Sequence, residues 1–216
     1  LTMQIARQVY NIMTAENGMI FFADGTPAYI TRRFDIREDG TKIPQEDFAS
    51  LIGKTSEIHG KDFKYTGCYK DIAQIIRKYV TAWMVETDKF FTQVIFNYAF
   101  SNGDAHLKNF SLQMSKDGDY LLSPAYDLMN TSLHTHDEDF ALEGGLSDTL
   151  EKSDIYEQKG HPCREDFISF GKEIGLTDKI IEKRLSPFLR EQPGVLELIS
   201  RSFLEEKQKR MYLSSY

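Results

Sequence analysis

The sequence has no long apolar segment. No run of about eighteen apolar residues, the length that spans a bilayer as a helix, occurs in it. The first residues also lack the basic-then-apolar pattern of a secretory leader. We therefore expect no contact with a membrane and a cytoplasmic location.

Cysteine and positive charge are both scarce. Cys68 and Cys163 are the only cysteines among 216 residues, and they lie far apart without C-x-x-C spacing, which favours free thiols in a reducing compartment. Lys and Arg number 26 against 33 Asp and Glu, a net charge of −7. Binding nucleic-acid phosphates requires a basic stripe. We therefore expect any contact with DNA to be indirect, through a partner protein.

Several well-known site motifs are absent. There is no G-x-x-x-x-G-K-[ST] or G-x-G-x-x-G loop to cradle a triphosphate. There is also no G-x-S-x-G elbow and no H-E-x-x-H helix, so nothing supports a hydrolase. What is present is 41% hydrophobic and 12% aromatic content, enough for one well-packed core with a small appended lobe.

Three side chains suit phosphoryl transfer. Asp104 and Asn109 are separated by four residues, and Asp127 follows eighteen positions after Asn109. In a phosphotransferase the first Asp accepts the proton of the acceptor hydroxyl, while an Asn and a later Asp supply oxygen ligands to magnesium. Residues 110–113 and 120–122 are predicted strands around a turn at 115–119, which would return Asp127 towards Asn109.

Asp and Asn are also ordinary turn residues, so this spacing alone is a weak signal. Three further features favour catalysis: His106 two residues after Asp104, the predicted hairpin behind Asn109, and an Asp that follows Pro124 and Tyr126. A zinc site at residues 134–139, where two His alternate with polar and acidic residues, is the weaker alternative to a solvated loop there.

Residues 102–111 and 122–127 together resemble the HipA family of bacterial serine/threonine kinases, which are toxins of toxin–antitoxin pairs. Residues 29–35 and 44–48 resemble two further motifs of that family in the same order. The core of the first motif also resembles phosphatidylinositol kinases. The resemblance implies a protein-kinase-like α+β fold: residues 1–35 as the remnant of a small β-containing N-lobe with the hinge, and 36–216 as a mostly α-helical C-lobe. Within the C-lobe, residues 101–110 would be the catalytic loop and 123–128 the segment of the metal-binding Asp.

The resemblance also implies roles for single residues. Asp104 would be the catalytic carboxylate, and Asn109 and Asp127 would hold Mg²⁺. Contacts to ATP would come from the hinge and from the catalytic region: Arg32, Arg33, Phe34, His106, Leu107, Lys108, Asn109 and Tyr126. Ile36 departs from the family, which usually has Arg there, so no role of that Arg is transferred.

The implied function is an ATP-dependent and magnesium-dependent protein serine/threonine kinase that phosphorylates a translation component, such as an aminoacyl-tRNA synthetase. The implied partner is a helix-turn-helix antitoxin that binds DNA. Two alternatives stay open: a pseudokinase or scaffold that binds the antitoxin, and a small-molecule or lipid kinase. The presence of Asp104, Asn109 and Asp127 favours a working kinase over a scaffold.

The family's phosphate-covering loop and strand-borne Lys have no counterpart in this sequence. We therefore expect a fragment that is nearly inactive by itself, because charge stabilisation and water exclusion around the transferred group would be missing.

The remaining pattern predicts the elements around the site. We expect a hairpin from residues 18–22 and 28–33, and a helix that starts at residues 44–47. Further helices are predicted, with Thr177 as an N-cap, at residues 69–79, 83–100, 164–174, 177–185 and 195–211. Residues 54–67 are predicted to be a plain surface loop, and residues 128–161 occupy the position of an activation loop.

Overall fold

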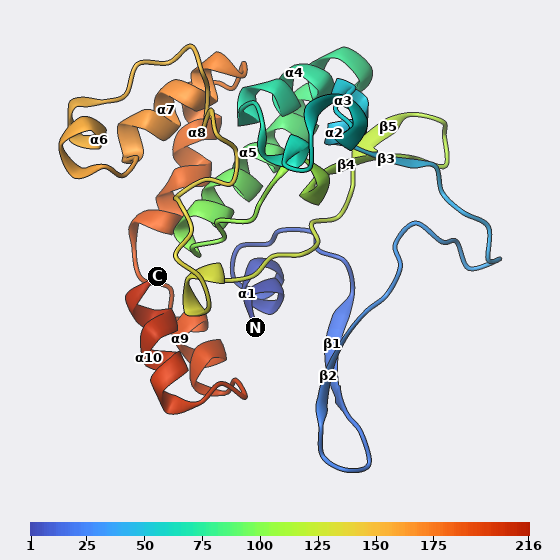
Figure 1. Cartoon of the computed structure of the whole chain (residues 1–216), viewed down its shortest axis with the longest axis vertical. Coiled ribbons are helices and arrows are strands. Elements are labelled where there is room, and N and C mark those ends of the chain that lie inside the picture. Colours follow the sequence, from blue (N-terminus) through green and yellow to red (C-terminus); the bar gives the residue numbers. More distant parts are fainter.

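The computed structural model describes residues 1–216. Ten α-helices and five short strands form an α+β fold with two separate antiparallel sheets (Figure 1). No helix has both the length and the apolar character to cross a membrane.

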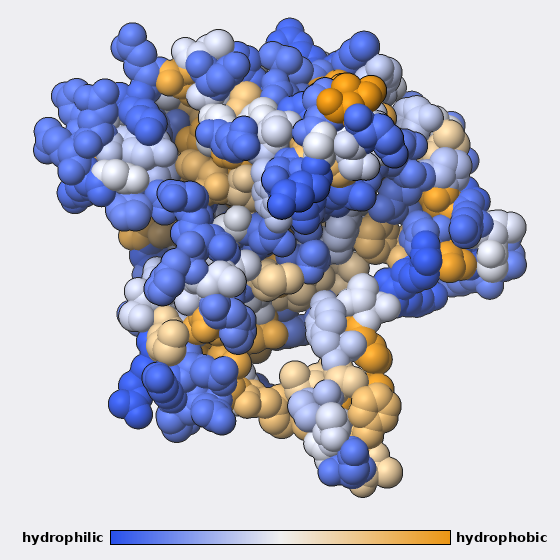
Figure 2. Space-filling view, viewed as in Figure 1, coloured by the Kyte–Doolittle hydropathy of each residue, from blue (hydrophilic) through white to orange (hydrophobic).

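The first sheet is the hairpin of β1 (Asn17–Phe21) and β2 (Pro27–Thr31), which extends away from the rest of the molecule (Figure 1). It confirms the predicted hairpin. Its apolar side chains are largely exposed, with Phe21 and Tyr29 at 50% and 57%. Figure 2 shows these apolar residues along the lower part of the view.

The second sheet consists of β3 (Gln45–Asp47), β4 (Ser111–Met114) and β5 (Tyr120–Leu122), in that order. The β4–β5 hairpin confirms the prediction for residues 110–122. The helix predicted to start at residues 44–47 is present but begins only after Asp47, because residues 45–47 pair with β4 as a strand. The helix α2 (Phe48–Ile52) follows directly, and the Asp47 side chain caps it by accepting from the Ser50 amide at 2.9 Å.

The main core surrounds α4 (Tyr69–Tyr79) and α5 (Trp83–Ala99), whose predicted positions are confirmed. The helix α5 is buried on most sides, since Phe90 and Phe91 on one stretch and Phe96 further along are all fully buried. The helices α7 (Arg164–Glu173) and α8 (Asp178–Leu185) pack against this core and match the prediction. Thr177 occupies the N-cap of α8, but its side chain makes no capping hydrogen bond.

A second, smaller core joins the two ends of the chain. It contains α1 (Thr2–Gln8), α9 (Pro193–Ser200), α10 (Glu206–Ser214) and the end of α5. The prediction of one helix over residues 195–211 was wrong. The first helix ends at Ser200, and a capping box of Glu205 and Gln208 starts the next one.

Residues 54–67 are not a plain loop, so that prediction was wrong too. They form the short helix α3 (Ser56–His59) and the 3-10 helix η1 (Phe63–Tyr65). Residues 128–161 contain the 3-10 helix η3 (Thr131–Leu133) and α6 (Asp154–Lys159), with irregular chain between them.

Candidate functional site

The catalytic-loop candidate begins where α5 ends. Phe100 is fully buried and stacks on Phe96 with ring centroids 4.4 Å apart, which fixes the end of the helix. Ser101 then adopts a left-handed backbone with φ of 51°, and the chain turns away from the helix axis. Asn102 holds the turn, because its amide donates to the Asn97 carbonyl at 2.8 Å. The loop therefore leaves the core in one defined direction.

Gly103 lies where the loop meets the chain after Asp127. Its amide donates to Thr131 Oγ1 at 3.0 Å. A Cβ at position 103 would lie 2.3 Å from the Asp137 Cβ and 2.8 Å from the Glu138 carbonyl oxygen. No side chain fits there without movement of one of the two segments. The glycine thus allows residues 131–138 to pack directly on the loop.

Asn109 and Asp127 meet in the structure. Asn109 Nδ2 donates to Asp127 Oδ2 at 2.9 Å, and Asn109 Oδ1 accepts from the His106 amide at 3.1 Å. The β4–β5 hairpin returns the chain to this point, and the buried Glu86 on α5 accepts from the Leu122 amide at 3.0 Å. The sequence argument that the hairpin brings these two side chains together is therefore matched by the geometry.

Asp104 lies on the same loop, half-buried, and its Oδ1 accepts from the Tyr65 hydroxyl at 2.8 Å. The His106 backbone amide donates to the Asp104 carbonyl at 2.8 Å and to Asn109 Oδ1 at 3.1 Å, which links Asp104 to the Asn109–Asp127 pair. The three predicted side chains thus belong to one neighbourhood, and neither carboxylate is buried against a basic group.

His106 is more than nine-tenths buried, with Lys64 Nζ 2.8 Å from its Nε2. Burial, and then the Lys64 charge, lower the pKa of His106, so the ring is neutral at pH 7. An ammonium group can only donate, so Nε2 accepts and the proton is assigned to Nδ1. Nδ1 is buried without a hydrogen-bond partner.

The donor set around Asp127 suits a hard divalent cation. The Asp127 carboxylate is exposed, and the Asn109 amide that bonds to it through Nδ2 also carries an oxygen, Oδ1. Carboxylate and amide oxygens are ligands that Mg²⁺ takes from proteins while it keeps several waters. No group of three or more His, Cys, Asp or Glu side chains lies close enough to hold a metal ion anywhere in the chain. The zinc interpretation of residues 134–139 therefore gains no support.

Tyr126 and Phe34 lie together beside the loop. Their rings are 5.5 Å apart, and the Phe34 carbonyl accepts from Gln113 Nε2 on β4 at 2.8 Å. The Tyr126 hydroxyl donates to the Lys108 carbonyl at 2.7 Å and lies 2.6 Å from Ser111 Oγ. Burial raises the pKa of Tyr126 to about 12, so the phenol stays protonated. The predicted hinge residue and the predicted pocket tyrosine are thus brought together.

The other residues that were predicted to contact the nucleotide lie in different surroundings. Arg32 pairs with Glu16 at 3.1 Å and Arg33 pairs with Asp35, and both arginine side chains are exposed at the base of the hairpin. Leu107 is completely buried in the main core, so its side chain offers no surface to a nucleotide. Lys108 is exposed, with its ammonium 5.9 Å from the centre of the Phe63 ring.

Sequence analysis missed two residues that contact the loop, Lys64 and Tyr65. Both lie on η1, in the segment predicted to be a plain surface loop. Their partners, His106 and Asp104, follow about forty positions later, and no short-range pattern links the two segments. Only the packing of η1 against the loop brings them together.

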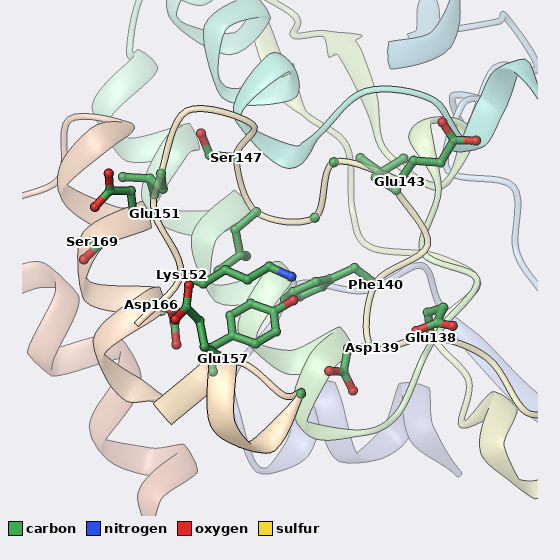
Figure 3. Close-up of a pocket in the computed structure, with 17 residues that line it drawn as sticks. Glu138, Asp139, Phe140, Glu143, Ser147, Glu151, Lys152, Glu157, Asp166 and Ser169 are labelled. Carbon is green, nitrogen blue, oxygen red and sulfur yellow. The ribbon is translucent and has the colours of Figure 1, made fainter. Parts of the chain in front are cut away.

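A cavity of 710 Å³ lies beyond the loop, under residues 138–157. Figure 3 shows acidic side chains around it, with Lys152 between them. Two of these acids are already engaged: Asp139 pairs with His161, and Asp166 accepts from the Ser153 and Cys163 amides. Asp104, Asn109 and Asp127 do not line this cavity.

Comparison with known proteins decides the family. The family described as HipA-like C-terminal domain matches residues 1–194 of the 216. The chain belongs to this family. This HipA-like domain is 27% identical, over the whole length of the chain, to a putative kinase of Haemophilus influenzae. The chain covers 66% of that protein. The putative kinase Y4mE of Sinorhizobium fredii is 27% identical over 76% of the chain, which covers 38% of that relative.

Two solved structures share the fold of this HipA-like domain. HipA of Shewanella oneidensis, in a complex with HipB and its operator DNA, aligns with a TM-score of 0.73 at 19% identity, over 99% of this chain and 51% of that one. The Helicobacter pylori proinflammatory kinase CtkA aligns with a TM-score of 0.61 at 14% identity, over 99% of this chain and 78% of that one. The predicted α+β, kinase-like fold is therefore confirmed. The domain spans about two thirds or less of the curated relatives' length.

Proposed function

We propose that the protein is an ATP-dependent and magnesium-dependent kinase that transfers the γ-phosphoryl group to a serine or threonine hydroxyl of a protein. The observation that carries the proposal is the hydrogen bond between Asn109 and Asp127, in the same neighbourhood as Asp104. Two oxygen donors for a metal and one separate carboxylate for a proton are what phosphoryl transfer requires.

Each residue has a distinct task in the proposed reaction. Asp104 accepts the proton of the acceptor hydroxyl as that oxygen bonds to the γ-phosphorus. The bond from this phosphorus to the β–γ bridging oxygen breaks, and ADP leaves with the bond's electrons. Asn109 and Asp127 would hold the magnesium, which supplies positive charge against the phosphate oxygens. Tyr126 and Phe34 would offer an aromatic surface to the nucleotide.

The toxin role and the partner are part of the same proposal. The likeness to HipA, solved with HipB and operator DNA, supports a helix-turn-helix antitoxin as the partner in the cytoplasm. The net charge of −7 supports contact with DNA through that antitoxin alone. A translation component such as an aminoacyl-tRNA synthetase is the proposed acceptor. ATP and Mg²⁺ are the proposed substrate and metal.

The test compares Asp104→Asn and Asp127→Asn in the natural gene product that carries this sequence. Asp104→Asn should lower phosphoryl transfer from [γ-³²P]ATP by about 100-fold to 10,000-fold and leave ATP binding intact, because only proton acceptance is lost. Asp127→Asn should abolish the magnesium dependence of ATP binding, measured by calorimetry with and without MgCl₂. Asn is chosen at position 127 because it tolerates the left-handed backbone there, where φ is 58°.

The control is Asp117→Asn, which removes an exposed carboxylate from the β4–β5 turn. It should change neither the rate of phosphoryl transfer nor the magnesium dependence of ATP binding. Wild-type transfer by Asp104→Asn would disprove its catalytic role. Unchanged magnesium dependence in Asp127→Asn would remove that residue from the metal site. Expression that arrests growth, relieved by Asp104→Asn, would separate a toxin kinase from a scaffold.

A further inference from the structure

The Asp104 carboxylate has one side-chain hydrogen bond, from the Tyr65 hydroxyl at 2.8 Å. Tyr65 is half-buried beside His106, with the two rings 5.2 Å apart. Burial, and then the bond to Asp104, raise the pKa of Tyr65, so this hydroxyl keeps its proton and remains a donor. The bond fixes Oδ1 of Asp104 and leaves Oδ2 without a partner.

Tyr65 belongs to a short segment, residues 63–67, that we call the strap. The strap is held from one side by Lys54, whose ammonium donates to both the carbonyl and the hydroxyl oxygen of Thr66 at 2.8 Å. From the other side, the Glu143 amide donates to the Tyr65 carbonyl and the Gly144 amide to the Gly67 carbonyl, both at 2.9 Å. The backbone on each side of the Tyr65 side chain is therefore fixed.

Residues 143–146, in the chain after Asp127, hold the strap on the side opposite Lys54. Two more backbone bonds continue the pairing, from Tyr69 to the Gly145 carbonyl and from Lys70 to the Leu146 carbonyl, each at 3.0 Å. The approach is close: a Cβ at Gly144 would lie 2.9 Å from the Gly67 carbonyl oxygen and 3.0 Å from the Cys68 Cβ. The segment 143–146 and the strap therefore fit together only with glycine at 144.

We propose that Tyr65 is a positioning residue for Asp104, and that residues 143–146 hold it in place through the strap. The inference rests on the proposed function, because it assigns Asp104 the role of proton acceptor. A carboxylate fixed through one oxygen presents the other in a constant direction to the acceptor hydroxyl. Misplacement of about 1 Å can cost about 100-fold in rate, so one hydrogen bond has a measurable effect.

The first variant is Tyr65→Phe, which removes only the hydroxyl. We expect kcat for phosphoryl transfer from [γ-³²P]ATP, to the protein itself or to water, to fall by about 10-fold to 100-fold, with KM for ATP within about twofold of wild type. The matched control is Tyr79→Phe on α4, an exposed tyrosine whose hydroxyl has no hydrogen bond, and it should behave as wild type.

The second variant, Gly144→Ala, tests the anchor without touching the catalytic loop. The added methyl must displace the strap, so we expect the same loss of kcat with KM for ATP unchanged. Gly18→Ala is its control, because a Cβ there meets nothing within 4 Å. Wild-type kcat in Gly144→Ala would overturn the role of residues 143–146.

A spectroscopic measurement makes the outcome independent of activity. In protein labelled with [¹³Cζ]tyrosine, the Tyr65 signal is identified by its loss in Tyr65→Phe. Asp104→Ala should lower the pKa of Tyr65, because the carboxylate that favours the protonated phenol is gone. An unchanged Tyr65 titration would overturn the proposal at its hydrogen bond.

The two proposals fail in different ways. If Asp104→Asn abolishes transfer while Tyr65→Phe keeps wild-type kcat, positioning by Tyr65 is disproved and the kinase proposal stands. If both variants transfer at the wild-type rate while the Tyr65 titration responds to Asp104, the hydrogen bond is real, but the catalytic role of Asp104 and the positioning role of Tyr65 are both disproved.

Discussion

At the scale of single residues, Asp127 is held in an unusual backbone conformation. Its φ of 58° lies in the left-handed region, which costs a non-glycine residue on the order of 1 kcal/mol or more. Its neighbours fix it there, because Ala125 and Leu128 are both buried in the smaller core. The strain aims an exposed carboxylate at Asn109, so the position serves the site more than the stability of the fold.

Gly103 is a position in the loop with no room for a side chain. We expect Gly103→Ala to destabilise the protein by about 1–3 kcal/mol, because a Cβ would clash with Asp137 and with the backbone of Glu138. Urea denaturation measures the loss, and Gly18→Ala serves as the control with open space around it. Equal stability of the two variants would contradict the close packing of residues 137–138 on the loop.

At the scale of elements, the Asp166 carboxylate on α7 binds the residues that precede α6 and α7. Asp166 is buried and accepts from the Cys163 amide at 2.7 Å and from the Ser153 amide and hydroxyl at 2.9 Å. Burial alone would raise its pKa, but the hydrogen bonds from Cys163 and Ser153 outweigh burial and lower it. The charged form is therefore the one that the fold stabilises.

The lowered pKa of Asp166 sets the direction of a pH dependence. Its contribution to stability is present above the unfolded-state pKa of about 3.9 and is lost as the pH falls through the lower folded-state value. We expect Asp166→Asn to reduce the free energy of unfolding at pH 7 by about 2 kcal/mol, and by much less near pH 2. Urea denaturation at both pH values measures this. Asp154→Asn, an exposed acid of α6, is the control, and a pH-independent difference would argue against the ionic contribution.

At the scale of the whole molecule, the site lies where the two cores meet. Leu107 and Phe110, on either side of Asn109, belong to the main core, while Ala125 and Leu128, on either side of Asp127, belong to the smaller one. The Asn109–Asp127 hydrogen bond therefore connects segments that are anchored in different cores. Their relative position depends on both cores being intact.

The overall charge predicts weak binding to DNA. With a net charge of −7, we expect the chain without a partner to bind a 30-base-pair duplex more weakly than about 10⁻⁴ M at physiological salt. Fluorescence anisotropy of a labelled duplex, in a titration from 50 to 200 mM salt, measures this. Tighter binding with a steep salt dependence would reveal a basic surface and contradict contact through a partner alone.

The sequence by itself determined the elements whose signals are local. Two short strand-like segments around a turn at residues 115–119 predicted the β4–β5 hairpin, helical periodicity predicted α4 and α5, and the spacing of Asp104, Asn109 and Asp127 indicated the chemistry. The break between α9 and α10 was missed, because the apolar pattern continues through residues 201–205 while caps end one helix and start the next.

Only the tertiary structure decided what surrounds the catalytic-loop candidate. Lys64 and Tyr65 contact His106 and Asp104 because the strap is held between Lys54 and residues 143–146. The bonds from residues 143–146 to the strap join segments far apart in the sequence and use backbone atoms, which every residue carries. Backbone pairing leaves no mark on the order of side chains, and for that reason it had to be seen in three dimensions.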